Sequence, residues 1–199
     1  MQCRRGAGSK SVVLKHNVGR NKNRDLEGFY STPEIYTEWL LENEDFEGII
    51  CEPACGDGRM AKVLKANGYH VRCSDIVDRG YKPMLVRDFF DWKCVDNIVT
   101  NPPYELAEEF IHHALKICPQ KVCMLLRLNF LESQGRYQRL WSKTPPARVY
   151  VASQRVTMMP AIMRANGKMK AANAISYAWF VWDKAYKGPT KLKWLRPHK

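Results

Sequence analysis

The chain has 199 residues, a formal net charge of +12 at pH 7 and an apolar fraction of 45%, which is ordinary for a globular protein. This length is sufficient for one domain with a full hydrophobic core, and no apolar run is long enough to span a membrane. The seven cysteines are an odd number without a Cys-x-x-Cys pair, which disfavours a disulfide framework and a zinc site. We therefore expect no bound metal. Since no signal peptide is recognisable, we expect a cytoplasmic protein.

Hydrophobic periodicity predicts helices and strands that alternate along the chain. The expected helices are Pro33–Glu44, Arg59–Asn67, Glu105–Ile117 and Gln134–Trp141. The expected strands are Ile49–Cys51, His70–Cys73, Met84–Val86, Asn97–Thr100, Val122–Leu128, Val149–Ala152 and Ile175–Trp182. This order predicts an α/β fold with a Rossmann-like, doubly wound, mostly parallel sheet and one or more antiparallel strands at its C-terminal end.

These elements are expected to form a single domain, residues 29–186. A basic, flexible arm is expected before it (residues 1–28) and a basic tail after it (residues 187–199). Thr32 is expected to cap the first helix, with Pro33 in its first turn. A long basic loop, Arg155–Ala174, separates the last two predicted strands.

Charge is distributed unevenly along the chain. Residues 1–24 carry seven basic and no acidic side chains, residues 25–120 carry nine basic and eighteen acidic ones, and residues 121–199 carry sixteen basic and two acidic ones. Because basic surfaces attract polyanions, the C-terminal part predicts a nucleic-acid partner, whose binding elements are expected mainly in residues 129–174. The alternative is a basic face that only keeps the protein soluble.

The segment from Gly48 to Met60 has the pattern of a strand, a glycine turn and the start of a helix. Gly56 and Gly58 allow a tight turn and a close approach of the backbone to a ligand. Ligands of open α/β sheets bind at the carboxyl ends of strands, where this turn is expected to lie. The turn lacks the three-glycine dinucleotide pattern and the Gly-Lys-Ser/Thr of a P-loop, so it predicts neither of those sites.

The sequence Asn101-Pro102-Pro103-Tyr104 directly follows the predicted strand Asn97–Thr100. Its two prolines stiffen the turn and push the asparagine into an extended conformation. The amide oxygen and nearby carbonyl groups can then accept hydrogen bonds at one fixed point beside an aromatic face. This arrangement suits a planar amino group that is held and stacked, although a plain Pro-Pro turn has the same residues.

Together the two motifs resemble those of the S-adenosylmethionine-dependent amino-methyltransferases, specifically the phage-type DNA adenine N6-methyltransferases. The resemblance extends from about Phe29 to Asp183, and the order of motifs is similar to the gamma type of that family. It implies the methyltransferase version of the α/β fold, with S-adenosylmethionine as cofactor and S-adenosylhomocysteine as product. Little chain follows the catalytic half, so a short or relaxed target sequence is implied. The resemblance also suggests a restriction-modification role in a bacterial or phage-infected cytosol.

The resemblance assigns four segments to the cofactor. Phe29–Pro33 looks like the N-terminal contact motif, Glu52–Gly58 like the methionine-binding loop, Asp75 like the acid that holds the ribose, and Asp88–Phe90 like the adenine-binding segment. The cofactor-binding residues are therefore expected to be Tyr30, Thr32, Pro33, Glu52, Pro53, Ala54, Gly56, Asp57, Gly58, Asp75, Asp88 and Phe89.

The implied catalytic residues are Asn101, Pro102, Pro103 and Tyr104. The Asn101 side-chain oxygen and the Pro102 carbonyl would accept hydrogen bonds from the two N–H groups of an adenine amino group and so localise its lone pair. Tyr104 would stack on the base. In a duplex that base must first be flipped out. The residues expected to contact the nucleic acid, mostly through phosphates, are Arg127, Asn129, Arg136, Arg139, Lys143, Arg155, Arg164, Lys168 and Lys170.

Three other functions fit the same sequence. An RNA adenine or guanine methyltransferase uses a similar turn, a protein glutamine methyltransferase faces the same delocalised amide nitrogen, and a nucleic-acid-binding module without turnover would keep the basic surface. The Phe29–Pro33 motif favours double-stranded DNA as the partner, with RNA as the alternative. Both a monomer and a homodimer are compatible with the sequence.

Overall fold

The computed structural model of the chain describes residues 30–154, 156, 158–160 and 175–196. The predicted N-terminal arm and most of the predicted loop Arg155–Ala174 lie outside the described residues. No helix within the described ranges is long and apolar enough to cross a membrane.

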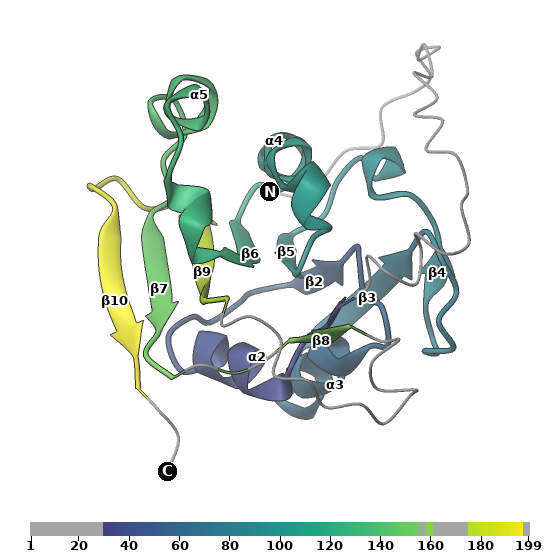
Figure 1. Ribbon diagram of the computed structural model, residues 1–199. Helices are drawn as coiled ribbons and strands as arrows, with labels where there is room; N and C mark the ends of the chain where they lie inside the picture. The colour runs from purple at the N-terminus through teal and green to yellow at the C-terminus, as the bar shows by residue number, and fades with distance from the viewer. Residues whose placement is uncertain (1–29, 155, 157, 161–174, 197–199) are drawn as a thin grey trace, which may run out of the picture.

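An eight-stranded sheet runs through the middle of the structure, in the order β10-β7-β9-β6-β5-β2-β3-β4 (Figure 1). Its strands are β2 (Ile49–Glu52), β3 (His70–Asp75), β4 (Leu85–Val86), β5 (Asn97–Thr100), β6 (Lys121–Arg127), β7 (Arg148–Ala152), β9 (Tyr177–Asp183) and β10 (Lys191–Leu195). Neighbouring strands are parallel except where β9 pairs with β6 and with β7. The predicted α/β class, with a mostly parallel sheet and an antiparallel strand near the C-terminus, is confirmed.

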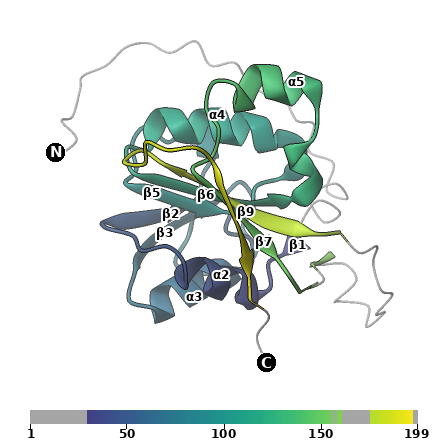
Figure 2. The same cartoon turned by 90° about the vertical axis from the view of Figure 1, so that its left-hand side faces the viewer.

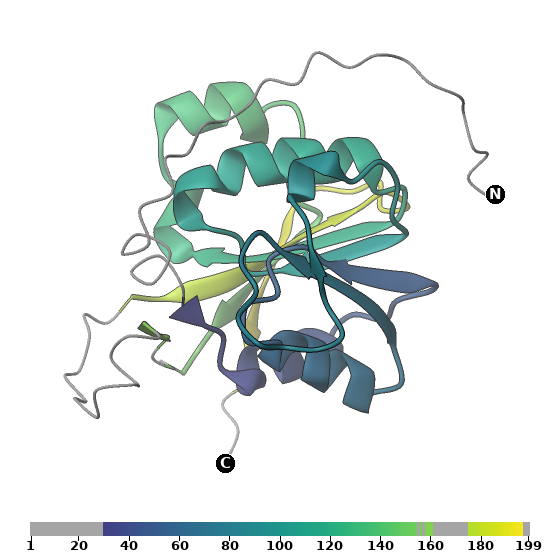
Figure 3. The ribbon, with the colours of Figure 1, turned by 90° about the vertical axis from the view of Figure 1, so that its right-hand side faces the viewer.

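Helices cover both faces of this sheet, as Figure 2 and Figure 3 show from opposite sides. The helices α2 (Glu34–Leu41) and α3 (Arg59–Ala66) lie on one face, and α4 (Ala107–Ile117) and α5 (Gln134–Arg136) lie on the other. The apolar run in β6 is nearly continuous because the strand is buried on both sides: Met124 packs in the cluster under α4, and Leu125 in the cluster under α2.

A second, two-stranded sheet lies beside the main one. It pairs β1 (Tyr30–Ser31) antiparallel with β8 (Met159–Pro160), with Ser31 opposite Met159. The start of the described chain is thereby held against the segment that follows β7, close to the carboxyl ends of the central strands (Figure 3).

Most predicted elements agree with the structure to within one or two residues. The helix predicted over Pro33–Glu44 ends earlier, at Leu41, and the short strands β1 and β8 were not predicted. The strand β10 lies where only a tail was predicted. The predicted helix Gln134–Trp141 is three α-helical residues followed by a π-helical turn, Tyr137–Trp141. The predicted cap of α2 is wrong: Pro33 is the N-cap and no side chain bonds there, because the Thr32 hydroxyl instead accepts a hydrogen bond from Asn101.

Candidate active site

The two sequence motifs meet at one edge of the sheet. The parallel strands β2, β3, β5 and β6 end at Glu52, Asp75, Thr100 and Arg127, so these residues share the carboxyl edge. Open α/β sheets bind ligands at this edge. The candidate site therefore lies where the glycine turn after β2 faces the Asn-Pro-Pro-Tyr turn after β5.

The glycine turn is fixed by the end of the neighbouring strand. The backbone N–H of Gly56 donates to Asp75 Oδ2 at 2.9 Å, and the N–H of Cys55 donates to the Ser74 carbonyl at 3.0 Å. Gly56 and Gly58 have φ values of 54° and 75°, which a side chain rarely adopts. A Cβ on Gly58 would also lie 2.2 Å from the Tyr81 ring, so no side chain fits at this position.

Asp75 is buried and holds two segments with its carboxylate. In addition to the bond from Gly56, its Oδ1 accepts the N–H of Val77 at 3.0 Å. Each carboxylate oxygen can accept more than one hydrogen bond, so the carboxylate retains acceptor capacity for the hydroxyl groups of a ligand.

The segment Tyr30–Pro33 contacts the glycine turn directly. The Ser31 hydroxyl donates to Asp57 Oδ2 at 2.6 Å, and Arg59 Nε donates to the same oxygen at 3.2 Å. Two segments that were assigned to one cofactor from the sequence are therefore joined by a hydrogen bond. Ser31 was not among the predicted site residues, although it lies inside the predicted contact motif Phe29–Pro33.

Glu52 carries a buried carboxyl group at the end of β2. Its Oε2 is buried and has no hydrogen-bond partner among the described residues. Burial raises the pKa of this carboxyl group well above its usual value. A buried acceptor without a partner is costly, so this atom is suited to a donor supplied by a ligand.

Asn101 presents a second unpartnered acceptor at the same edge. Its side-chain nitrogen donates to Thr32 Oγ1 at 3.0 Å and lies 3.7 Å from Met158 Sδ. Its Oδ1 is buried and accepts no hydrogen bond from the described residues. Because the nitrogen end of the amide is engaged, the oxygen end is the one available to accept an N–H from a ligand.

Tyr104 lies in an aromatic cluster next to Asn101. Its ring is 5.9 Å from the rings of Tyr30 and Tyr177, and the Arg127 guanidinium lies 4.6 Å from its centroid. Its hydroxyl is 3.3 Å from Met158 Sδ, and burial raises the pKa of this phenol far above its usual value, so it is neutral. Met158 was not predicted, and nothing in its sequence neighbourhood indicates this contact.

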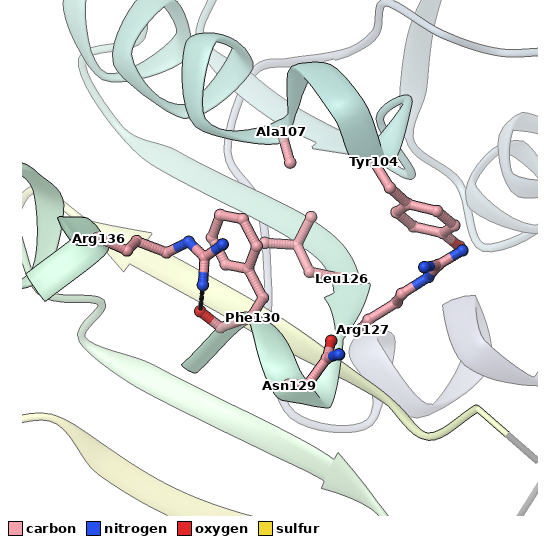
Figure 4. A pocket seen from close by; sticks show the side chains of 7 residues that line it. All are labelled: Tyr104, Ala107, Leu126, Arg127, Asn129, Phe130 and Arg136. Carbon is pink, nitrogen blue, oxygen red and sulfur yellow. Dashed lines mark hydrogen bonds between the residues drawn. The ribbon is translucent and has the colours of Figure 1, made fainter. Parts of the chain in front are cut away.

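A pocket of about 190 Å³ opens beside Tyr104 (Figure 4). Its lining residues come from the turn after β5, the start of α4, the end of β6, the turn that follows β6, and α5: Tyr104, Ala107, Leu126, Arg127, Asn129, Phe130 and Arg136. In Figure 4 the side chains of Tyr104 and Arg127 point toward one another. The pocket therefore joins the Asn-Pro-Pro-Tyr turn to three of the residues predicted to contact nucleic acid.

The remaining predicted cofactor residues differ in their exposure. Pro53 is buried, while Ala54 and Pro33 are half-buried. Asp88 is exposed, and its carboxylate accepts the N–H of Phe90. Phe89 is only 1% exposed, because it packs against Phe110 and His113 of α4 in the core, and this packing leaves its ring no open surface.

The predicted nucleic-acid residues divide by how they are engaged. Arg136 donates to the Phe130 carbonyl at 2.7 Å and lies over the Phe130 ring, while Arg139 forms a two-point ion pair with Glu108 at 2.6 and 3.0 Å. Asn129 and Lys143 are exposed. The other members of the set lie outside the described residues: Arg155, Arg164, Lys168 and Lys170.

No protein-family model matches the chain, and no curated protein matches it by sequence. Solved structures do match. A proposed RNA methyltransferase from Pyrococcus horikoshii is 15% identical with a TM-score of 0.55, over 81% of this chain and 89% of that one. TrmN from Thermus thermophilus is 17% identical with a TM-score of 0.51, over 76% of this chain and 48% of that one. The chain has a methyltransferase fold.

A third similar structure contains the cofactor. It is the magnesium protoporphyrin IX methyltransferase from Synechocystis with bound S-adenosylmethionine, which is 14% identical with a TM-score of 0.50, over 83% of this chain and 92% of that one. Identities this low establish the shared fold, while the activity of this chain has to be argued from its own residues.

Proposed function

We propose that the chain transfers a methyl group from S-adenosylmethionine to the exocyclic N6 amino group of adenine in DNA. The observation that carries the proposal is the buried Asn101 Oδ1, which accepts no hydrogen bond from the described residues. It lies in a stiff turn after β5, at the same sheet edge as the glycine turn. A fixed acceptor beside a tyrosine is what an aromatic amino group requires.

The cofactor is assigned to the glycine turn and its neighbours. When bound, S-adenosylmethionine supplies an electrophilic methyl group on a sulfonium sulfur. On this chain, Asp75 would accept hydrogen bonds from the ribose hydroxyls and Glu52 from a cationic or N–H group, because both carboxyl groups are buried at this edge. Gly56 and Gly58 let the backbone approach the ligand closely.

The chain's part in the transfer is to hold and align the amino group. The amine of adenine is a poor nucleophile because its lone pair is delocalised into the ring. Asn101 Oδ1 and the Pro102 carbonyl would accept hydrogen bonds from its two N–H groups. These hydrogen bonds would draw the nitrogen toward tetrahedral geometry and localise its lone pair for the transfer. Asn101 is neutral, so it does not serve as a general base, and the methylated, positively charged nitrogen would lose its proton to water after the transfer.

Tyr104 would stack on the target base, and this requires Arg127 to move. The guanidinium now lies over the Tyr104 ring, where it covers part of that face. When a base takes this position, the Arg127 cation is expected to turn toward a phosphate next to the flipped nucleotide. Further phosphate contacts are assigned to Asn129, Arg136, Arg139 and Lys143, and to four residues outside the described part, Arg155, Arg164, Lys168 and Lys170.

RNA is the second candidate substrate. The choice of DNA rests on the likeness of Phe29–Pro33 to a motif of DNA methyltransferases. The similar structure from Pyrococcus horikoshii is described as a proposed RNA methyltransferase, which favours RNA at the level of the fold. An Asn-Pro-Pro-Tyr turn and a basic surface suit either polymer, so the test includes both.

The test is a methylation assay. The purified protein is incubated with S-adenosylmethionine and unmethylated duplex DNA, with RNA and protein in parallel, and the products are digested for nucleoside and amino-acid mass spectrometry. We expect N6-methyladenine in the DNA. Methyl groups in RNA alone would move the proposal to its second candidate, and methyl groups in protein glutamine would contradict both.

Asn101→Ala tests the catalytic assignment. The variant loses the side-chain acceptor, so turnover should fall by at least about a hundredfold, while S-adenosylmethionine still raises its melting temperature. Asn67→Ala, in an exposed asparagine at the end of α3, is the matched control and should keep both properties. Full activity of Asn101→Ala would contradict the mechanism.

A further inference from the structure

The last strand of the sheet is an exposed edge strand whose carboxyl end lies on the same side of the sheet as the candidate site. Among the described residues, β10 pairs only with β7, so its other side is open (Figure 1). Since β10 and β7 run in the same direction as β6, the strand ends at the sheet edge that carries Asn101. The sequence predicted only a tail here, and the proposed function does not use this strand.

The open edge carries large apolar side chains in water. Trp194 is 66% exposed and Leu192 is 50% exposed. In the register with β7 they lie beside Val151 and Val149, so they extend the sheet face that α4 covers further along. A flat indole left this open is unusual for a side chain that only fills space, and it is the kind of surface on which a nucleic-acid base stacks.

The charge around Trp194 is positive. From residue 184 to residue 199 the chain has six Lys and Arg side chains and no Asp or Glu. Lys191 and Arg196 are exposed, and Lys193 donates to the Asn43 side-chain oxygen at 2.6 Å. Beside the indole lies a pocket of about 240 Å³, lined by Glu42, Asn43, Lys193, Trp194, Leu195 and Arg196. Glu42 is the one acidic residue in this lining.

We propose that β10 binds an unpaired segment of the DNA substrate, with a base stacked on Trp194 and neighbouring phosphates held by Lys191 and Arg196. The proposal rests on the proposed function for its choice of DNA. β10 is four strands from β5, and neighbouring strands are about 4.8 Å apart, so the platform is about 19 Å from the catalytic turn. A DNA strand that runs from the catalytic turn along the carboxyl ends of the β-strands would reach Trp194 within a few nucleotides.

A second copy of the chain is the rival occupant, since an open edge strand can pair with its own equivalent. In a two-fold arrangement each copy would present the same surface, so the basic edge of one would face the basic edge of the other. Lysines on an edge strand are a recognised means of preventing such pairing. Charge therefore favours a polyanion over a second copy.

The test measures binding without methylation. A short labelled oligothymidylate lacks adenine, so it reports the platform and not the target site. We expect Trp194→Ala to weaken its binding about tenfold, because stacking is sequence-tolerant and of that strength. Trp194→Phe should keep most of the affinity. Val86→Ala, in a side chain that is 64% exposed on the opposite edge strand, is the matched control and should bind like the wild type.

The result separates this proposal from the proposed function. Wild-type affinity in Trp194→Ala, with methylation of DNA intact, would overturn the platform alone. Loss of binding in that variant, with no methylation by the wild type, would support the platform and contradict the activity. Tighter, Trp194-dependent binding of oligouridylate would overturn the choice of DNA. A wild-type dimer that becomes a monomer in Trp194→Ala, measured by sedimentation, would assign the edge to a second copy and overturn the proposal.

Discussion

The amide of Asn101 has its orientation set chiefly by the Thr32 hydroxyl, with a longer contact to Met158 Sδ. Its nitrogen donates to the hydroxyl of Thr32, a residue 69 positions earlier in the chain, and this leaves the oxygen as the free end. Thr32 itself is buried, so water does not replace the contact easily. Thr32 was predicted to cap a helix and to contact the cofactor; in the structure its hydroxyl accepts the Asn101 N–H and so orients the proposed catalytic amide.

Removing this hydroxyl should slow methyl transfer without weakening the binding of S-adenosylmethionine. In Thr32→Val the amide loses the bond that fixes its direction, and a neutral hydrogen bond of about 1 kcal/mol corresponds to a turnover about five to ten times lower. Thr32→Ser keeps the hydroxyl and should stay near the wild-type rate. Single-turnover rates are measured beside the melting-temperature shift caused by S-adenosylmethionine. An equal loss of that shift would instead make Thr32 a cofactor ligand.

At the scale of elements, one buried carboxylate joins the loop after α2 to the strands β6 and β7. Glu44 accepts hydrogen bonds from Lys121 of β6 at 2.8 Å, from Arg148 of β7 at 2.9 Å and from the Tyr150 hydroxyl at 2.7 Å. Arg148 also donates to Asp183 of β9 at 2.8 Å. The network lies at the amino ends of β6 and β7, opposite the candidate site, so it is suited to fixing the order of these strands.

Breaking this network should destabilise the fold. Glu44→Ala removes the shared carboxylate from two half-buried cations, of which Arg148 keeps Asp183, so we expect a cost of about 2 to 3 kcal/mol in the free energy of unfolding, below that of a fully buried pair. Asp78→Ala removes an exposed ion pair with Lys82 and should change stability little. Chemical denaturation measures both. Similar midpoints for the two variants would mean that the network is not a source of stability.

The same carboxylate predicts how stability depends on pH. Burial alone would raise the pKa of Glu44, but hydrogen bonds from Arg148, Lys121 and Tyr150 hold it below its usual 4.5. The folded state therefore binds this proton less readily than the unfolded state, so the stabilisation is present above about pH 4.5 and is lost as the pH falls further. Glu44→Gln should flatten that part of the stability profile.

The elements that the sequence predicted well are those buried on a clear pattern. Strand β5 has the predicted ends because all four of its residues are buried. Strand β10 was missed because four of its five residues are exposed and only Leu195 is buried, so lysine alternates with apolar residues in a segment that has the composition of a tail. The π-helical turn after α5 has no signal in the sequence, and we have no physical account of it.

The candidate site was likewise predictable only where a local pattern determines the structure. Local motifs predicted which turns form it, because Asn101 and the glycines are constrained by their immediate neighbours. Contacts between distant segments were not predictable: Met158 touches Asn101 and Tyr104 across more than fifty residues, and Arg127 reaches the Tyr104 ring from another strand. These pairs depend on the sheet order, which brings β5, β6 and the segment after β7 together.

At the scale of the whole molecule, the sheet separates two kinds of charge. The part that forms the glycine turn is acidic, and residues 121–199 carry sixteen basic and two acidic side chains. Because β6, β7 and β10 end at the same edge as β2 and β5, both parts meet at the candidate site. A cofactor site and a polyanion surface can thus share one edge while differing in charge.

This separation predicts that salt affects the two ligands differently. Binding to DNA releases counterions from its phosphates, so the logarithm of the protein's affinity for DNA falls linearly with the logarithm of the salt concentration. For about six phosphate contacts, the affinity falls by about a thousandfold between 50 and 200 mM salt. Affinity for S-adenosylmethionine should change little over that range, because its proposed contacts are buried and few. Lys143→Ala, in an exposed lysine, should reduce the salt slope of DNA binding by about one.

The matched control is Lys82→Ala, an exposed lysine in the acidic part whose ion pair is with Asp78. It removes the same charge from the chain, so net charge alone would lower the slope equally in both variants. If phosphates contact the basic part, only Lys143→Ala should change the slope. Equal slopes would mean that DNA responds to the total charge of +12 and not to a surface near the site.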